Sequence, residues 1–396
     1  MCLTPACAKG DNYLGVIAQI SIEGVRNDEP ITLHWIAKSV PQNETFRKFA
    51  VLDKVYRNEI YIYEEVFPIF RKFCAENGIP KTPITLAKLI GSHTVPFQEA
   101  LIMEDMKEKG FILKNRKDPL DFQHVKLAME NYGRYHAISY AIKDQKPEIF
   151  NEIKKAIADD FFLMISEEVI KKQEETYCSR TLNTFDPIKE ASYIKIFEKY
   201  KMKSFEIVRE KLRKGFEDPY AMVNHGDSWM NNMLFKYEDE TAPTSPIDVC
   251  LLDFQLARCG SPAFDLSYFI FSSTEKELRD RHYDELIDVY YQSLCKQLVA
   301  LGSSPGKMLP FDVLQEHLKR YSVVGYFLTQ LVLHIMLSDA EETPDFQSSL
   351  NDDNISEALD YKSKNEEFYS RRIKDIVVDF VEKGYFDFLD NEYNCS

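Results

Sequence analysis

Over the first hundred residues, apolar positions repeat at the spacing of β-strands around one helical stretch. Residues 13–23 and 31–40 are rich in β-branched and aromatic residues and flank a turn at 24–30, which predicts a hairpin with a longer loop. Asn43 is placed to cap a helix that continues to about Phe73. Two more strand candidates follow, near 84–90 and 98–104. The pattern predicts a small antiparallel sheet with one long helix.

After residue 105 the apolar residues take the spacing of amphipathic helices. Residues 121–143 carry one apolar face, and a β-rich island at 221–257 contains a polar, proline-bearing loop at 236–246. Further amphipathic segments lie at 148–175, 187–214, 275–301, 311–339 and 356–384. The chain is therefore predicted to be α+β and bilobal, with a β-rich N-lobe at 1–105 and a mainly helical C-lobe at 106–396. A cleft between two lobes is a common place for a small-molecule site.

The composition narrows the function classes. A chain of 396 residues that is 44% hydrophobic has ample material for a large core, and its net charge of −15 disfavours nucleic-acid binding through a broad basic surface. The eight cysteines are scattered without a C-x-x-C pair, which favours free thiols in a reducing compartment. The first residues lack the pattern of a signal peptide, and no apolar run reaches the roughly 18 residues of a membrane helix. We expect a cytoplasmic protein with no membrane contact.

One polar island between apolar runs carries the strongest chemical signal. His225, Gly226 and Asp227 are followed, five residues after the Asp, by Asn232. A phosphotransferase loop has this layout, in which the Asp orients and deprotonates the attacking hydroxyl and the Asn holds a magnesium ion. An ordinary turn Asp and a strand-edge Asn are the alternative interpretations. His225 and Gly226 are interpreted as residues that shape the loop.

A second signal is the buried-type strand at 249–252 that ends in Asp253. A carboxylate at this place is the expected second magnesium ligand, because Mg²⁺ takes oxygen ligands and a buried Asp without a partner is costly. Asp265 is expected to cap a helix or to hydrogen-bond the catalytic loop. Three aromatic residues lie nearby in the sequence: Trp229, Tyr268 and Phe269. They could line an acceptor pocket, but in a chain so rich in aromatic residues such side chains more often belong to the core.

Lys38 is the candidate for holding the nucleotide phosphates. It ends an apolar strand, where a kinase lysine contacts the α- and β-phosphates and pairs with a helix Glu. Glu59, in the helix that follows, is the best partner for Lys38. Glu64 lies about 140° farther around that helix and should not share the face of Glu59.

Two further segments are candidates for nucleotide contacts. Residues 10–15 hold only two glycines, but Asn12 and the backbone N–H groups beside it are suited to phosphate. Residues 100–106 read as the last strand of the N-lobe and a hinge, where backbone groups at Glu104 and Met106 would bind adenine. An ordinary turn and an edge strand are the alternative interpretations.

These blocks occur in the order found in one family. The blocks are Gly10–Tyr13, Lys38, Glu59, Leu101–Met106, Tyr135–Ala137, His225–Asp227 with Asn232, and Asp253–Gln255 with Gly260–Leu266. In this order the sequence resembles the ecdysteroid kinase-like family (EcKinase, CHK kinase-like). That family belongs with the aminoglycoside and choline phosphotransferases of the protein-kinase-like fold. The resemblance extends from about Gly10 to the last helices, and the His-Gly-Asp and Asp-Phe-Gln blocks are its specific parts.

The resemblance implies ATP and Mg²⁺ as cofactors and phosphorylation of a hydroxyl on a small molecule. The implied acceptors are ecdysteroids or related steroid and xenobiotic alcohols. One alternative is a kinase of plant phenols, glycosides or choline-like alcohols in detoxification. Another is a non-catalytic small-molecule-binding protein of the same fold, against which the intact candidate site argues. The chain starts nine residues before Gly10, which leaves room for a short first strand with reduced nucleotide affinity or indicates a truncated gene model.

Overall fold

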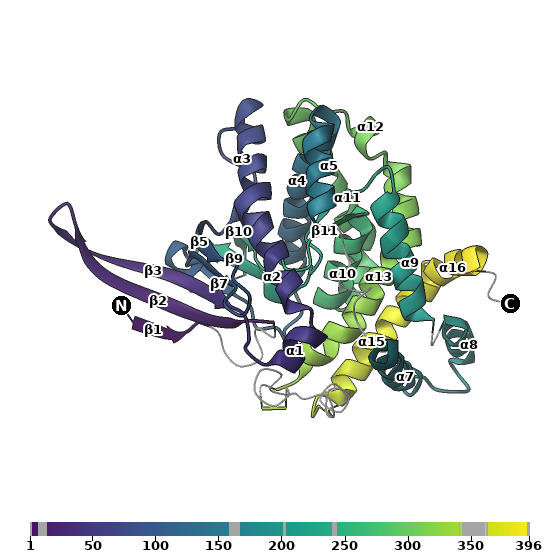
Figure 1. Cartoon of the computed structure of the whole chain (residues 1–396). Helices are drawn as coiled ribbons and strands as arrows, with labels where there is room; N and C mark the ends of the chain where they lie inside the picture. The colour runs from purple at the N-terminus through teal and green to yellow at the C-terminus, as the bar shows by residue number, and fades with distance from the viewer. Residues whose placement is uncertain are drawn as a thin grey trace.

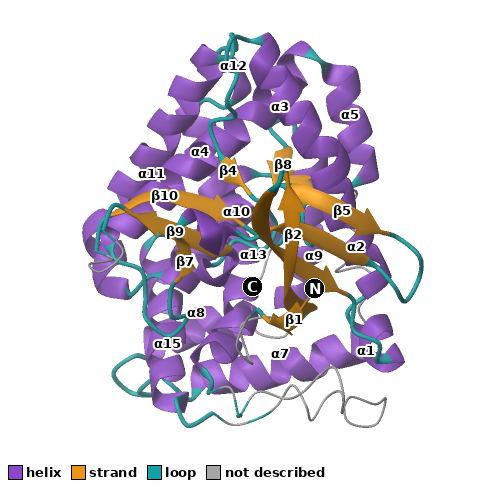
Figure 2. Ribbon diagram, turned by 90° about the vertical axis from the view of Figure 1, so that its left-hand side faces the viewer, coloured by secondary structure: helices purple, strands orange, loops and turns teal. Residues whose placement is uncertain are grey.

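The computed structural model describes residues 2–6, 14–157, 167–200, 203–239, 244–339, 341–342, 361 and 363–393. Its strands gather on one side of the molecule, and long helices form the rest of the body (Figure 1). Seen from that side, the strands cross the middle of the molecule with helices above and below them (Figure 2). The chain is an α+β protein, which confirms the predicted fold class.

Five antiparallel strands form the first sheet, in the order β1-β2-β3-β6-β5. Their bounds are Cys2–Pro5 for β1, Val16–Arg26 for β2, Glu29–Ser39 for β3, Ala100–Glu104 for β6 and Leu89–His93 for β5. β1 has four residues, so the first strand is short. β3 lies between β2 and β6, and Lys38 near its end is paired with Ile17 on one side and Leu101 on the other.

The hairpin of β2 and β3 corrects the prediction of a longer loop. The register is unbroken from Val16↔Ser39 to Arg26↔Glu29, so the turn consists of Asn27 and Asp28 alone. Both turn residues have positive φ, 53° and 62°, which is the conformation of a tight two-residue turn. Gly24 and Pro30 suggested a wider turn in the sequence, but both lie within the paired strands. Figure 1 shows the end of this hairpin extending beyond the helical body.

The predicted long helix is interrupted rather than continuous. Helix α1 covers Glu44–Phe49 and begins with Asn43, whose side chain accepts a hydrogen bond from the Phe46 N–H at 2.8 Å. The predicted cap is therefore confirmed. Val51 has φ 49°, and this left-handed residue breaks the helix before α2 begins. The following elements are α2 (Leu52–Tyr61), a π-helical turn η1 (Ile62–Val66) and α3 (Phe67–Glu76).

A second sheet joins segments from both halves of the chain, in the order β4-β10-β9-β7. The bounds are Thr85–Leu86 for β4, Pro246–Leu251 for β10, Met233–Tyr237 for β9 and Phe111–Leu113 for β7. The strand expected near 84–90 is thus divided: β4 pairs in parallel with β10, and β5 pairs with β6 in the first sheet. A short pair of β8 (Met222–Asn224) and β11 (Arg258–Gly260) completes the β-structure of the described residues.

Helices pack around these two sheets and form most of the core. Helix α4 (Phe122–Gln145) packs along α11 (Lys276–Ala300), and α10 (Pro262–Ser273) packs along α13 (Phe311–Leu337). The remaining elements are η2 (Met106–Lys109), α5 (Pro147–Ala156), α7 (Glu167–Leu182), α8 (Ala191–Tyr200), α9 (Ser204–Glu217), η3 (Met230–Asn232), α12 (Pro305–Met308), α15 (Glu366–Glu382) and α16 (Tyr385–Tyr393). Among the described residues, no helix combines the length and the apolar character needed to cross a membrane.

Candidate active site

Lys38 is the centre of a buried ion-pair cluster. Its Nζ lies 2.8 Å from Oε2 of Glu59 and 2.8 Å from Oδ1 of Asp253. Lys38 is 2% exposed and Glu59 is 0% exposed, so solvent screens neither charge. Burial alone would lower the pKa of Lys38, but the charges of Asp253 and Glu59 outweigh it and raise that pKa. The ammonium therefore stays charged.

The loop after β10, residues 253–257, is called the metal loop below. Asp253 opens it with φ 62°, a left-handed conformation that is uncommon outside glycine. Phe254 packs into the core between the rings of His225 and Phe67, with centroid distances of 4.4 Å and 4.8 Å. Leu252 N–H donates to the carbonyl oxygen of Asn232 at 2.9 Å. These contacts hold the start of the metal loop, with its Asp253 carboxylate, against Asn232.

Residues 225–229 connect β8 to η3 and present Asp227. Because the sequence predicts a catalytic Asp here, this segment is called the catalytic loop below. Oδ2 of Asp227 accepts hydrogen bonds from Nδ2 of Asn232 at 2.7 Å and from Nε1 of Trp229 at 3.3 Å. Oδ1 accepts from the hydroxyl of Tyr268 at 3.1 Å. Burial and the charge of Asp253 raise the pKa of Asp227 to about 6, although the three hydrogen bonds oppose this shift. A carboxyl with such a pKa is suited to accepting a proton near neutral pH.

Asp265, at the start of α10, holds the backbone of the catalytic loop. Its carboxylate accepts from the N–H of His225 at 2.8 Å, from the N–H of Gly226 at 2.9 Å and from the hydroxyl of Ser228 at 2.8 Å. His136 of α4 lies 3.1 Å away through Nε2. Burial alone would raise the pKa of Asp265, but these hydrogen bonds and the charge of His136 lower it to about 2. The predicted loop contact of Asp265 is therefore present.

His225 and Gly226 shape the catalytic loop, as predicted from the sequence. Nε2 of His225 donates to the carbonyl oxygen of Leu252 at 2.8 Å, and Nδ1 accepts from the N–H of Asp227 at 3.2 Å. Both ring nitrogens are thus used by the backbone, and burial lowers the pKa of His225. Gly226 has φ 86° and lies against the carbonyl of Leu256. No side chain fits there, which explains the glycine.

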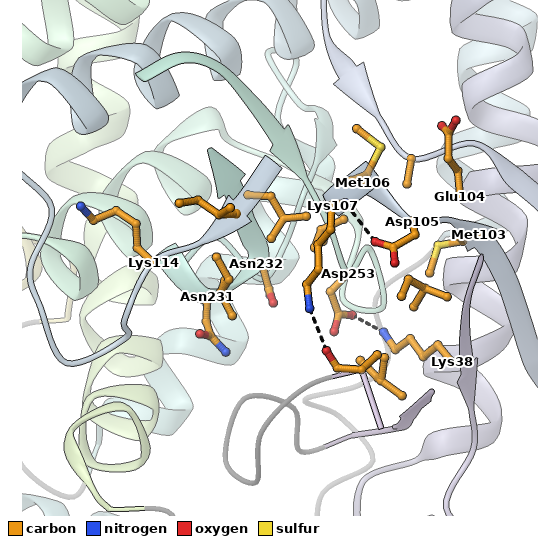
Figure 3. A pocket seen from close by; sticks show the side chains of 18 of the residues that line it. Lys38, Met103, Glu104, Asp105, Met106, Lys107, Lys114, Asn231, Asn232 and Asp253 are labelled. Carbon is orange, nitrogen blue, oxygen red and sulfur yellow. Dashed lines mark hydrogen bonds and ion pairs between the residues drawn. The ribbon is translucent and has the colours of Figure 1, made fainter. Parts of the chain in front are cut away.

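The ion-pair cluster lines a cavity of about 810 Å³ between the two sheets. Figure 3 shows Lys38, Asn232 and Asp253 on its wall together with Glu104 and Met106. The backbone N–H of Glu104 donates to the carbonyl oxygen of Lys88 at 2.9 Å. Asn12 lies outside the described residues. Pro5 and Ala6, which come before Asn12 in the sequence, line the same cavity.

The donor set of the cavity fits a magnesium ion. Nδ2 of Asn232 is used by Asp227, through the carbonyl at 3.0 Å and through Oδ2 at 2.7 Å, so its side-chain oxygen remains as the ligand atom. Asp253 lines the same cavity and supplies carboxylate oxygens. The pKa of Asp227 is raised in part by the negative charge of Asp253, and a cation between these groups would relieve that repulsion. An oxygen-only site of this kind suits a hard divalent cation.

The structure also shows contacts that the sequence did not reveal. Trp229 and Tyr268 are buried and donate to Asp227, and neither is among the residues that line the cavity. Phe269 is 0% exposed and belongs to the core. Asn58 donates to two backbone carbonyls of the metal loop. Its position directly before Glu59 was the only sequence signal for that role.

Comparisons with known proteins identify the family. A search among curated proteins finds no match. Among solved structures, a mutant aminoglycoside 2′-phosphotransferase-IIIa in complex with GDP aligns with 100% of this chain and 94% of its own, at 9% identity and a TM-score of 0.39. The sequence pattern of the ecdysteroid kinase-like family matches residues 9–303, well over half of the chain. A lysine on the third strand paired with a helix Glu, followed by the catalytic and metal loops, is the layout of a kinase. The chain belongs to the ecdysteroid kinase-like family.

Proposed function

We propose that this protein transfers the γ-phosphoryl group of ATP to a hydroxyl of a small molecule. The observation that carries the proposal is the Lys38–Glu59–Asp253 cluster, which lies on one cavity wall with Asn232, while Asn232 binds Asp227. Phosphoryl transfer needs a cation for the phosphates, a metal site and a carboxylate for the acceptor. Lys38 is suited to the first task, and Asn232 and Asp253 to the second. Asp227 is suited to the third, and the four side chains belong to one cluster of contacts.

The N-lobe, residues 1–105, is proposed to bind the nucleotide. Lys38 would contact the α- and β-phosphates, because its ammonium is charged, buried and held in place by Glu59. Backbone groups at Glu104 and Met106 would bind adenine, and Asn12 would contact a phosphate. The C-lobe, residues 106–396, would contribute the catalytic loop, the metal loop and the acceptor pocket.

Asp227 is proposed to orient the acceptor hydroxyl and to take its proton. The acceptor oxygen forms a bond to the γ-phosphorus while the bond from that phosphorus to the β–γ bridging oxygen breaks. The products are ADP, a phosphate monoester and a proton that passes through Asp227. Asn232 and Asp253 would hold Mg²⁺, which neutralises charge on the phosphate oxygens when bound. The hydrogen bonds from Trp229 and Tyr268 keep the Asp227 carboxylate in one orientation.

The proposed acceptor is an ecdysteroid or a related steroid or xenobiotic alcohol. The family to which the chain belongs supports this class. The net charge of −15 supports a small-molecule partner over a nucleic acid. The six described cysteines are free thiols, which supports a reducing compartment such as the cytoplasm.

The proposal is tested by incubating the protein with ATP, Mg²⁺ and a pool of alcohols, and by searching for phosphorylated products by mass spectrometry. The pool contains ecdysteroids, other steroids, plant phenols, glycosides and choline. We expect a phosphate ester of a steroid alcohol from the wild type. A phosphate ester of a phenol, a glycoside or choline alone would keep the kinase activity and overturn the steroid class.

Two variants separate catalysis from binding. Asp227→Asn should lose product formation but keep thermal stabilisation by ATP with Mg²⁺, because Asp227 acts on the acceptor. Lys38→Met should lose both, because it removes the cation that contacts the phosphates. A wild type that ATP and Mg²⁺ do not stabilise, and that binds steroid without product, would contradict the proposal and favour a non-catalytic binding protein.

A further inference from the structure

The side chain of Asn58 lies between helix α2 and the metal loop. Its Nδ2 donates one hydrogen bond to the carbonyl oxygen of Gln255 at 2.9 Å and another to that of Ala257 at 2.8 Å. Asn58 lies 197 residues before Gln255 and 199 before Ala257, so this contact joins the N-terminal part of the chain to the C-terminal part. Both hydrogens of one amide group are used by a single loop.

Asn58 and Glu59 are consecutive residues of α2, and they hold opposite ends of the same loop. Glu59 binds Lys38 at 2.8 Å, and Lys38 binds Asp253 at the start of the loop at 2.8 Å. Asn58 binds the end of the loop at Gln255 and Ala257. One turn of helix therefore fixes both ends of the segment that carries the metal-binding carboxylate.

The conformation of the loop requires such support. Asp253 has φ 62°, which costs free energy for a residue other than glycine and persists only where the surroundings hold it. Gln255 is 2% exposed, and neither polar atom of its side chain has a partner among the described residues. Within the loop, the N–H of Ala257 donates to the carbonyl of Phe254 at 3.1 Å. Asn58 adds the contacts that tie this turn to a helix.

The loop also contacts the catalytic loop at the same point. Leu256, between the two carbonyls that Asn58 binds, places its own carbonyl against Gly226. A displacement of residues 255–257 would therefore reach Gly226 and the neighbouring Asp227. We propose that Asn58 is a positioning residue that locks the metal loop to α2 and so sets the place of Asp253 and, through Leu256, of the catalytic loop. Its catalytic part rests on the proposed function.

The test compares Asn58→Leu, which has nearly the same size but no donor, with Asn58→Gln, which keeps the amide on a longer arm. Asn77→Leu is the matched control, because Nδ2 of Asn77 donates to the carbonyl oxygen of Phe73 at 3.0 Å at the far end of α3. The first measurement is hydrogen–deuterium exchange of residues 253–257 without nucleotide. The second is the Mg²⁺ concentration that gives half of the maximal thermal stabilisation by ATP.

We expect Asn58→Leu to exchange about tenfold faster across the metal loop and to need about tenfold more Mg²⁺, because two hydrogen bonds to backbone carbonyls are lost. Asn58→Gln should fall between Asn58→Leu and the wild type in both measurements, and Asn77→Leu should match the wild type. Equal exchange of the loop in Asn58→Leu and Asn77→Leu would overturn the proposal. If Asn58→Leu does not fold, the proposal would be overturned by Asn58→Gln exchanging residues 253–257 at the wild-type rate.

The two readouts keep this inference apart from the proposed function. If the wild type shows no stabilisation by ATP and Mg²⁺, the proposed function fails, and the exchange experiment without nucleotide still decides whether Asn58 holds the loop. The opposite outcome is that every variant reaches half-maximal stabilisation by ATP at the same Mg²⁺ concentration as the wild type, with unchanged exchange of the metal loop. In that case the role of Asn58 fails and the proposed function stands.

Discussion

A Cβ atom added to Gly226 would lie 1.8 Å from the carbonyl oxygen of Leu256. The backbone of the catalytic loop therefore touches the backbone of the metal loop with no room for a side chain. Gly226 also has φ 86°, so an alanine there meets both a clash and an unfavourable conformation. The contact between the two loops depends on this glycine.

Gly226→Ala should lower the free energy of unfolding by about 2–4 kcal/mol, because the loops must move apart. Urea unfolding monitored by circular dichroism measures the change. Gly24→Ala is the matched control, since a Cβ at Gly24 meets nothing within 4 Å. Its stability should equal or slightly exceed that of the wild type, because an alanine in a strand loses less conformational entropy on folding. Similar stability of the two variants would contradict the contact.

Asp265→Asn should lose stability in a pH-dependent way. The pKa of Asp265 is lowered from 3.8 to about 2, so the ionised form contributes about 2 kcal/mol that is fully present above pH 4 and is lost as the pH falls toward 2. The wild type should therefore exceed Asp265→Asn by a constant amount between pH 5 and pH 8, and the difference should shrink in acid. Denaturant unfolding across this pH range provides the measurement. A difference that grows below pH 4 would speak against the assigned shift.

Tyr268→Phe should lower kcat about tenfold, because it removes a hydrogen bond that orients the Asp227 carboxylate. Thermal stabilisation by ATP and Mg²⁺ should stay at the wild-type level, since Tyr268 does not line the cavity. Tyr283→Phe is the control: its hydroxyl binds that of Tyr385 at 2.8 Å, away from the catalytic loop. Equal turnover in the two variants would show that the contact with Asp227 has no catalytic effect.

Asp28→Gly should raise the free energy of unfolding by about 0.5 kcal/mol, because both residues of the β2–β3 turn have positive φ and Asn-Gly is favoured in such turns. The urea midpoint reports the effect. Glu23→Gly, in the paired part of β2, should instead lose about 0.5–1 kcal/mol. If Asp28→Gly is destabilised as much as Glu23→Gly, the turn differs from the two-residue form.

The parts of the site that are close in sequence were predictable, and the distant contacts were not. Asp227 and Asn232 lie in one loop, and their spacing alone indicates a shared task. Lys38 and Glu59 lie on a strand and the helix that follows it, so their pairing could be inferred. Asn58 binds backbone carbonyls in a distant segment, and any residue at positions 255 and 257 offers the same acceptors. Such a contact leaves no pattern in the sequence.

The errors in the predicted elements have similar physical causes. Val51 breaks the predicted long helix through a left-handed backbone, without a glycine or a proline to mark the place. The two residues of β4 are too few to show a period, so their pairing with β10 could not be separated from the strand that follows. Gly24 and Pro30 suggested a wide turn, but the paired strands continue past both.

Thr85 and Leu86 supply a strand to the second sheet although the chain continues at once into the first. A polypeptide divided between residues 105 and 106 would therefore leave the outer strand of the second sheet on the first fragment. The second fragment would keep β7, β9 and β10, and the edge of β10 that pairs with β4 would be left without a partner. The separated fragments would each lack a hydrogen-bonding partner, and mixing them should restore the fold where neither fragment achieves it alone.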